Sequence, residues 1–591
     1  MEAGDHELVF LHFNDVYHIS DPGLVARFSG LLEHISASLP SPSSRRPIRV
    51  FSGDSFSPSL EASVLRGDHM VPILNALGTD VACYGNHDFD FGEEILAQLF
   101  QKTNFPWVMS NMFRPSPAGS LKTGVDKGVC MGEKELMAGA HKYVVKQVGS
   151  VRVGFFGLAG TDWPSNCQHL PACTIASPEN TAREVATLLR SKECCHVVIA
   201  VTHARLAEDL RVAAATEEGP GKVDLILGGH DHDVLRRMRG DTNSYAGVIH
   251  DGKSNEDVCR KDDGSVERCE GDVRVVKSGT DWKGVSTVRM KLRRDGDGEV
   301  CVETISVDQI YDIRLSPLYS SVTPNPVILS EIFSIHETIQ SAVQNPLFHS
   351  NAPLDGRSSI IRSQETNLGN MLADAARAFY NTDISFVNSG AVRCDRILPA
   401  SSLDSPLTVR DAIDILPFYN CIVVKKLPGK ILREALENSF SDRHLDGRFL
   451  QISGLSVIVS WGCPEGQRVK EAWWSPSGVD GEKRPLEGDR WYDVAMTQFI
   501  ADGFDGYTCF KDGETVLDAE GAMTDTELLL EVLGRGVEAE GDLRHKGNEG
   551  DKAEEGVRRS RAAVLKGYSD EHGLPVVEPV VDGRIRVTGS V

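Results

Sequence analysis

Short apolar runs alternate, in the first half of the chain, with segments that have the pattern of helices, such as residues 93–100. Near-continuous apolar strands are typical of sheets buried on both faces, and their alternation with helices is typical of parallel or mixed sheets. The pattern therefore predicts an α/β fold for this half of the chain. The five clearest strand candidates are residues 8–13, 48–51, 80–84, 196–201 and 223–227.

All five runs end in Asp, Asn or His. In open α/β sheets, ligands collect at the carboxyl ends of the strands, so we expect these polar side chains to converge on one rim of the fold. One such turn alone is explained equally well as a polar loop that caps a helix, but five of them together indicate a site. The polar residues are Asn14 and Asp15, Asp54, Asn86 and His87, His203, and His230 to His232.

The composition narrows the class of protein. At 591 residues the chain is longer than one hydrophobic core usually supports, so two or more domains are expected. The net charge of −23 argues against a nucleic-acid-binding surface, which needs clusters of Lys and Arg. The N-terminus has no signal-like stretch, no apolar run reaches membrane-spanning length, and the 13 cysteines are irregularly spaced. These features predict a cytoplasmic protein that binds neither nucleic acid nor a membrane.

A change in composition divides the chain. A stretch rich in Ser and Pro begins at residue 316, and a helical apolar pattern follows it. We expect a first domain over 7–315, a linker or bridging helix over 316–345 and a second domain over 346–540. Beyond residue 541 the chain is rich in Gly and in charges of both signs, which predicts a disordered tail over 541–591.

The residue types at the strand ends indicate metal chemistry. Mixed carboxylate, imidazole and amide ligands favour Zn²⁺, Mn²⁺ or Fe over Ca²⁺, whose ligands are all oxygen. A second Asp that could bridge suits two cations roughly 3.5–4 Å apart. Such a site activates water at neutral pH and neutralises the oxygens of a phosphoryl group under attack.

These motifs carry a family resemblance. Asn14-Asp15, Gly53-Asp54, Gly85 to Asp88, Thr202-His203 and Gly228 to His232 resemble the five ordered motifs of the calcineurin-like metallophosphoesterases. The second half resembles the C-terminal domain of the 5′-nucleotidase family, which also includes UDP-sugar hydrolases and 2′,3′-cyclic phosphodiesterases. The resemblance implies an N-terminal sandwich of sheets flanked by helices and a C-terminal α+β nucleotide-binding domain.

The resemblance also implies roles for single residues in the first domain. It places two divalent metal ions, Zn, Mn or Mg, on the strand-end residues, with Asp54 bridging them. It gives His87 the stabilisation of the phosphoryl oxygens in the transition state, oriented by Asp90. One ion would be held by Asp15, Asp54 and His232, and the other by Asp54, Asn86, His203 and His230.

The first motif departs from the family pattern. The family has Asp-x-His there, whereas Asp15 is followed by Val16, Tyr17 and His18. Tyr17 stands where the second ligand is expected, and His18 is displaced by one residue. Both outcomes stay open at this point: His18 reaches the metal, or the first ion has fewer protein ligands and is a weakly bound ion such as Mn²⁺ or Mg²⁺.

In the second domain the resemblance implies a nucleotide site. Aromatic faces accept any base by stacking, and Arg offers forked donors to anionic oxygens. The alternatives are that the two phenylalanines are core residues and that the Asn and Arg are structural. Arg362, Asn388 and Arg393 would hold the phosphate or ribose, Phe418 and Phe499 the base, and Asp505 the ribose hydroxyls.

The sequence therefore predicts a metal-dependent phosphohydrolase with a small-molecule nucleotide substrate. The predicted reaction is release of phosphate from nucleoside 5′-monophosphates by attack of a metal-bound water or hydroxide, with a hinge near residues 316–345. One alternative is the same chemistry on a UDP-sugar or a 2′,3′-cyclic nucleotide. Another is a non-catalytic nucleotide-binding protein with a weakened metal site.

Overall fold

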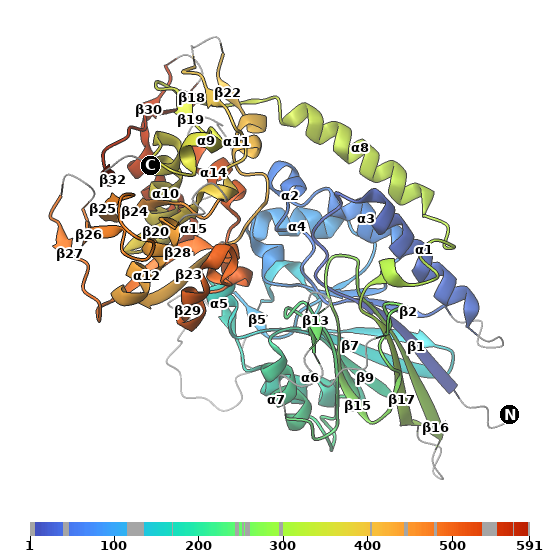
Figure 1. The fold of residues 1–591 in the computed structure, drawn as a ribbon. Coiled ribbons are helices and arrows are strands. Elements are labelled where there is room, and N and C mark those ends of the chain that lie inside the picture. Colours follow the sequence, from blue (N-terminus) through green and yellow to red (C-terminus); the bar gives the residue numbers. More distant parts are fainter. Residues whose placement is uncertain are drawn as a thin grey trace, which may run out of the picture. The chain divides into compact units, whose positions relative to one another are not determined.

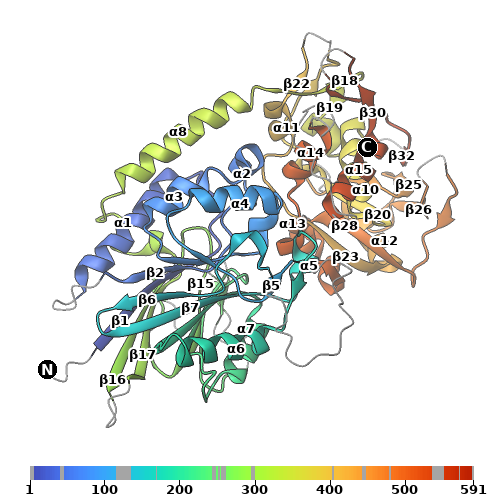
Figure 2. The same ribbon diagram turned by 180° about the vertical axis from the view of Figure 1, so that it is seen from behind.

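The chain folds into two compact units, residues 1–337 and 338–591. Each is described by itself on the ribbon of the computed structural model (Figures 1 and 2). The structure describes residues 6–39, 46–114, 135–167, 170–242, 248–250, 253–254, 261–294, 300–401, 405–441, 447–477, 481–534, 552–570 and 573–588.

The first unit contains a seven-stranded mixed sheet. Four neighbouring strands, β1 to β4, run parallel, while β16 pairs antiparallel with β1 and β17 with β16. The strand order is β14 (Cys269–Gly271), β17 (Val300–Ile310), β16 (Val285–Arg294), β1 (His6–Phe13), β2 (Ile48–Phe51), β3 (Val81–Cys83) and β4 (Trp107–Val108).

The second sheet of this unit has eight strands. Its central strands β7, β9, β10 and β15 are parallel, and antiparallel strands flank them. The strand order is β13 (Lys253–Ser254), β12 (Ile249–His250), β11 (Asp233–Met238), β15 (Val273–Ser278), β10 (Leu225–Gly229), β9 (Val197–His203), β7 (Val151–Ala159) and β6 (Val144–Val148).

The two sheets face each other and helices cover their outer faces (Figures 1 and 2). Phe10 of β1 and Phe155 of β7 meet between the sheets, with ring centroids 6.3 Å apart. The next residue, Phe156, belongs instead to the core beneath α6 and α7, because side chains alternate along a strand. Helices α1 (Pro22–Ser38), α3 (Met70–Ala76) and α4 (Glu93–Lys102) lie on one side, and α6 (Pro178–Ser191) and α7 (Leu206–Ala215) on the other.

This architecture confirms the predicted α/β fold. The five apolar runs are the strands β1, β2, β3, β9 and β10. The boundary between the units falls inside helix α8 (Pro326–Ala342), which continues from the first unit into the second. No helix among the described residues combines the length and the apolar character needed to span a membrane.

The second unit is built on a five-stranded mixed sheet. Strands β20 and β28 run parallel, and the remaining pairs are antiparallel. The order is β24 (Leu450–Ser453), β20 (Ile384–Asn388), β28 (Trp491–Thr497), β23 (Ile422–Pro428) and β29 (Glu514–Leu517). Its longer helices are α10 (Asn367–Tyr380), α11 (Val409–Ile415), α12 (Gly429–Ser439) and α14 (Asp525–Leu533).

The prediction of a disordered tail is wrong for residues 552–570 and 573–588. Helix α15 (Lys552–Val564) packs on α10, where Ser560 Oγ donates to the carbonyl of Ala375 at 2.6 Å. Strand β32 (Ile585–Thr588) extends a small sheet by pairing with β25 (Leu455–Ser460), and β31 (Pro575–Val577) pairs with β18 (Pro346–Ser350). The polar composition misled the prediction because these side chains bond to distant parts of the chain. Residues 541–551 lie outside the described residues.

Arg584 anchors this C-terminal segment. Its guanidinium is buried, lies 2.7 Å from an Asp374 carboxylate oxygen and 2.6 Å from an Asp582 oxygen, and donates to the carbonyl of Ile452 at 3.0 Å. A buried cation with this many partners holds its strand in place, and its loss leaves two carboxylates uncompensated.

We expect Arg584→Met to lower the free energy of unfolding by about 3 kcal/mol, since removing one partner of a buried ion pair is strongly destabilising. Urea unfolding measures the change. The matched control is Arg586→Met in β32, which begins directly after Arg584, where the side chain is exposed and the described hydrogen bond goes to the carbonyl of Gly583. Equal losses in the two variants would contradict an anchoring role for Arg584.

Candidate functional site

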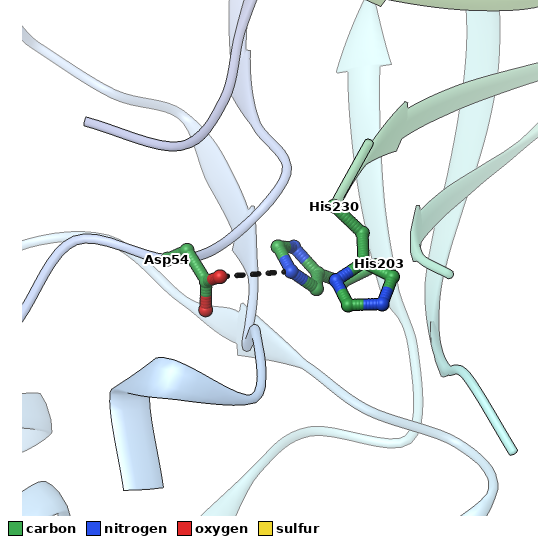
Figure 3. Close-up of side chains that lie close together, drawn as sticks. All are labelled: Asp54, His203 and His230. Carbon is green, nitrogen blue, oxygen red and sulfur yellow. Dashed lines mark ion pairs between the residues drawn. The ribbon is translucent and has the colours of Figure 1, made fainter. Parts of the chain in front are cut away.

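Residues from both sheets of the first unit meet at the carboxyl ends of their strands. Asp15 follows β1, Asp54 follows β2, His203 ends β9 and His230 follows β10, and all four are fully buried. Asp54, His203 and His230 each offer one ligand atom, and these three atoms lie within 4.8 Å of one another (Figure 3). His203 Nε2 lies 3.0 Å from Asp54 Oδ2 and 3.9 Å from Asp15 Oδ1. The expected convergence on one rim is therefore present for these residues.

The backbone is strained where it presents these side chains. Asp15, Asp54, His230 and His232 all adopt the left-handed region, with φ between 54° and 81°. Residues with a Cβ rarely adopt this region, and such strain collects at functional sites. Gly85 has the complementary task, because a Cβ there would lie 2.0 Å from Asp54 Oδ1. Backbone strain at these residues is the energetic cost of directing their carboxylates and imidazoles toward one point.

Asp88 ties two of the loops together. Its carboxylate accepts the backbone N–H of Gly85 at 2.8 Å, of Asp54 at 3.1 Å and of Ser55 at 2.9 Å. Burial, together with the neighbouring Asp54 carboxylate, raises the pKa of Asp88 to about 6. Sequence reasoning assigned it no role. The signal available in the sequence was an acidic residue directly after His87.

The ring orientations of two histidines fit a metal ligand set. His203 Nδ1 faces the carbonyl of Ser52 at 2.7 Å and must donate to it, so the Nε2 lone pair of a neutral ring points at Asp54 Oδ2. Two acceptors in this position need a proton or a cation between them. Burial lowers the pKa of His203, but Asp54 and Asp15 outweigh it and raise the pKa to about 9.

His230 has the complementary arrangement. Its Nε2 lies 2.9 Å from Asp162 Oδ2, while its buried Nδ1 has no hydrogen-bond partner among the described residues. An Nε2–H that donates to Asp162 leaves the Nδ1 lone pair directed into the buried site, as a metal ligand requires. Together, two carboxylates and two inward lone pairs fit a divalent cation of the Zn, Mn or Fe type.

His87 and Asp90 form a pair beside this cluster. Both belong to the turn around the short helix η1 (His87–Phe89), and His87 Nδ1 lies 2.7 Å from Asp90 Oδ2. The backbone N–H of His87 donates to Asp54 Oδ1 at 2.9 Å, which joins the pair to the carboxylate cluster. Asn86 directly precedes η1 and is fully buried.

Tyr17 joins the cluster, and His18 turns elsewhere. The Tyr17 hydroxyl lies 3.0 Å from Asp15 Oδ1, 3.2 Å from Asp54 Oδ2 and 2.8 Å from His232 Nε2. The His18 side chain is 42% exposed, and its Nδ1 lies 3.0 Å from Asp281 Oδ1. His232 Nε2 lies 3.4 Å from Asp15 Oδ1. The first-motif position that the sequence left open is therefore filled by Tyr17.

Two of the predicted nucleotide residues of the second unit, Asn388 and Phe499, lie at the carboxyl ends of β20 and β28. Asn388 ends β20, and its Oδ1 accepts the hydroxyl of Thr497 at the end of β28, at 2.9 Å. Phe499 follows two residues later and is 37% exposed, and Phe418 is 52% exposed. Neither phenylalanine is a core residue.

Two further contacts shape this aromatic surface. The Arg393 guanidinium lies 4.8 Å from the centroid of Phe418, and Phe504 stacks on Phe499 with centroids 5.0 Å apart. Sequence reasoning assigned no role to Phe504, because its stacking partner Phe499 is known only from the structure. Asp505 adopts φ 51° directly after Phe504, and Arg362 lies half-buried at the end of α9 (Ser358–Ile361), on a separate element.

Asp525 holds the turn that carries Phe418. Its carboxylate accepts the backbone N–H of Asn420 at 3.1 Å, the Asn420 amide at 3.3 Å and the N–H of Thr526 at 2.9 Å. Burial raises the pKa of Asp525 to about 7 against the opposing effect of these hydrogen bonds.

Comparison with known proteins agrees with this arrangement. The family model for the 5′-nucleotidase C-terminal domain matches residues 346–512. The chain is 24% identical over 550 residues to the trifunctional nucleotide phosphoesterase protein YfkN of Bacillus subtilis (strain 168), a match that covers 89% of this chain and 34% of YfkN. It is 24% identical over 547 residues to 5′-nucleotidase of Homo sapiens, covering 86% of this chain and 85% of that protein. The solved structure of NAD nucleotidase (NadN) of Haemophilus influenzae matches with a TM-score of 0.63 at 14% identity, covering 99% of this chain and 100% of that one.

Fold and site together define a two-unit α/β protein with a candidate metal centre at the strand ends of its N-terminal unit. The match to the 5′-nucleotidase C-terminal domain model covers residues 346–512, and the similarity to nucleotide phosphoesterases and 5′-nucleotidases extends along most of the chain. These are the proteins that its sequence motifs resemble.

The Asp525 carboxyl leads to a pH prediction. Because its pKa in the folded protein, about 7, is above the ordinary value of 3.8, the folded state holds the proton more tightly than the unfolded chain. The free energy of unfolding should fall as pH rises from about 4 to 7, by up to about 4 kcal/mol for a shift of this size. Asp525→Asn should lose this dependence, so urea unfolding at pH 5 and pH 8 compares the two proteins. Exposed Asp512→Asn is the control, and parallel pH profiles for wild type and Asp525→Asn would contradict the assignment.

Proposed function

We propose that this protein is a metal-dependent phosphohydrolase that releases phosphate from nucleoside 5′-monophosphates. The observation that carries the proposal is the buried convergence of Asp15, Asp54, His203 and His230 from two sheets, with imidazole lone pairs directed inward. The names of the relatives, 5′-nucleotidase and nucleotide phosphoesterase, support the same reaction class.

The centre would hold two divalent ions, with Asp54 among the residues proposed for both. Ions in such a pair lower the pKa of a bound water and neutralise charge on phosphoryl oxygens. The identity of the ions, Zn, Mn or Mg, is part of the proposal. The first set of residues is Asp15, Asp54 and His232, and the second is Asp54, Asn86, His203 and His230.

His87 is the proposed catalytic side chain outside the ligand set. An Nδ1–H that donates to Asp90 at 2.7 Å fixes the orientation of the ring, and in the imidazolium form the second nitrogen also carries a proton. Its remaining nitrogen can then donate a hydrogen bond to a phosphoryl oxygen as negative charge develops in the transition state. Asp90 is a positioning residue, because it acts through His87.

The second unit supplies the proposed nucleotide site. Exposed Phe418 and Phe499 offer flat faces to a base. Phe504 stacks on Phe499, and the Arg393 guanidinium lies over the ring of Phe418. The proposal assigns Arg362, Asn388 and Arg393 to the phosphate or ribose and Asp505 to the ribose hydroxyls. A cytoplasmic location and a purely small-molecule partner remain predictions from the sequence.

The reaction is tested by phosphate release from AMP. We expect metal-stripped protein to be inactive and to regain activity with Zn²⁺, Mn²⁺ or Mg²⁺. His87→Ala should lower kcat by about 10²- to 10⁴-fold, the usual contribution of a positioned proton donor. His34→Ala, at an exposed position of α1, is the matched control and should keep full activity.

A UDP-sugar and a 2′,3′-cyclic nucleotide complete the substrate panel. Faster metal-dependent turnover of either one would replace the 5′-monophosphate as the substrate and leave the reaction class in place. AMP binding without turnover under any metal would instead identify a non-catalytic nucleotide-binding protein.

The base-binding role of Phe418 is tested by a split in kinetic constants. Stacking of a base on an aromatic ring contributes about 1–3 kcal/mol, so Phe418→Ala should raise KM for AMP by about 10-fold or more. The KM for p-nitrophenyl phosphate, which has no base, should hardly change. Trp491→Ala removes a similarly exposed aromatic ring from the opposite end of β28 and serves as the control. Equal effects on both substrates would argue against stacking at Phe418.

A further inference from the structure

The Tyr17 hydroxyl occupies an unusual position. It lies within 3.2 Å of three atoms, Asp15 Oδ1, Asp54 Oδ2 and His232 Nε2, which all belong to the first proposed metal position. A phenol has one proton to donate, so it can satisfy only one of these neighbours at a time. His232 Nε2 can donate a second proton when that nitrogen carries one, but the phenol oxygen still approaches two carboxylate oxygens with a single proton of its own. A cation shared by these atoms would explain that approach.

The separations match those of atoms around one cation. When ligands lie about 2.1 Å from a metal, neighbouring ligand atoms are about 3.0 Å apart in an octahedron and about 3.4 Å apart in a tetrahedron. The three distances from the Tyr17 hydroxyl are 3.0, 3.2 and 2.8 Å, and Asp15 Oδ1 and His232 Nε2 are 3.4 Å apart. These four measured separations therefore fit the edges of a single coordination shell.

The chain holds Tyr17 in this place from several sides. The residue is 4% exposed, and its backbone N–H lies 3.3 Å from Asp281 Oδ1. Its ring packs edge-on against His232 and His87, with centroids 5.5 and 6.1 Å apart. A side chain so confined cannot swing away to make room for another ligand. His18 is held by the same Asp281, so it does not compete for the position.

We propose that Tyr17 is itself a metal ligand, which completes the first position with Asp15, Asp54 and His232. The inference rests on the proposed function for the existence of a metal centre and goes beyond it in the ligand set. An anionic phenolate oxygen in place of an imidazole makes this position richer in hard oxygen ligands. Such a position favours Mn²⁺ or trivalent iron over Zn²⁺.

The competing explanation is that the hydroxyl fills the first metal position. In that case the phenol takes the place of the ion as a hydrogen-bond donor to Asp15, Asp54 or His232, and the protein binds one ion per chain. The two explanations differ in the number of ions bound and in the spectrum of the loaded protein.

The test uses ferric iron as a probe, because a tyrosinate bound to Fe³⁺ gives a visible charge-transfer band and an imidazole or a carboxylate does not. Metal-stripped full-length protein is loaded with Fe³⁺, its absorption spectrum is recorded, and bound metal is counted by elemental analysis. We expect a visible band and about two ions per chain. Tyr17→Phe should lose the band and bind the first ion at least about 10-fold more weakly.

Two further variants keep the test decisive. Tyr17→His restores an imidazole and should bind both ions without the band, which also shows that the site tolerates substitution. Tyr143→Phe, a phenol whose hydroxyl bonds to Glu193 on the outer side of the second sheet, should keep the band and the ion count.

The outcomes separate the ligand assignment from the proposed reaction. One ion per chain in wild type and two in Tyr17→Phe, or an iron-loaded wild type with two ions and no band, would overturn the assignment of Tyr17. The band and the ion count do not depend on turnover. A protein that shows the band with Fe³⁺ but releases no phosphate with Zn²⁺, Mn²⁺ or Mg²⁺ would therefore sustain the Tyr17 ligand while refuting the phosphohydrolase.

Discussion

The first unit is organised by the burial of two carboxylates, Asp15 and Asp54, side by side and away from water. A buried charge is tolerated only when it is paired or binds a cation, so everything around these two groups must supply positive charge or hydrogen-bond donors. The raised pKa of His203 is one response to them, and the backbone N–H of His87 at Asp54 is another. The left-handed backbone at both aspartates and the absence of a side chain at Gly85 are the local costs of bringing them together. A pair of cations would neutralise what these protein groups leave uncompensated.

The same constraint explains why two sheets are needed. Strand ends of one sheet alone would place the carboxylates in a row, whereas facing sheets bring His203 and His230 against Asp15 and Asp54 from the other side. Just beneath the cluster, the neutral ring of His12 links the sheets, with Nδ1 2.7 Å from Ser278 Oγ and Nε2 2.8 Å from Ser52 Oγ. Burial lowers the pKa of His12 to about 3, so this link adds no charge beside the candidate metal site. Fold and site are therefore stabilised by one continuous polar network inside an apolar sandwich.

Sequence reasoning succeeded where one local pattern carried the whole signal. An apolar run followed by Asp or His locates the carboxyl end of a strand. Because the carboxyl ends of parallel strands lie at one edge of a sheet, five such ends are expected to lie close together. It left the choice between Tyr17 and His18 open, because one residue of offset decides which side chain lies beside Asp15 and Asp54. It failed for the C-terminal segment, since Arg584 finds Asp374 across 210 residues of sequence and no local composition reveals that partner. Asp88 and Phe504 were missed for the same reason, because their partners define their roles.

The two units solve different physical problems. The first holds buried charge at fixed positions, and any change there alters the pKa of several neighbours at once. The second presents Phe418 and Phe499 to solvent, with Arg393 and Phe504 as their local supports, so a substitution there changes the shape of an apolar surface and little else. The proposed reaction chemistry and the proposed base recognition are therefore separable in this chain. Variation among relatives that share its strand-end residues should concentrate on the aromatic surface, because that surface can change without unsettling the buried carboxylates.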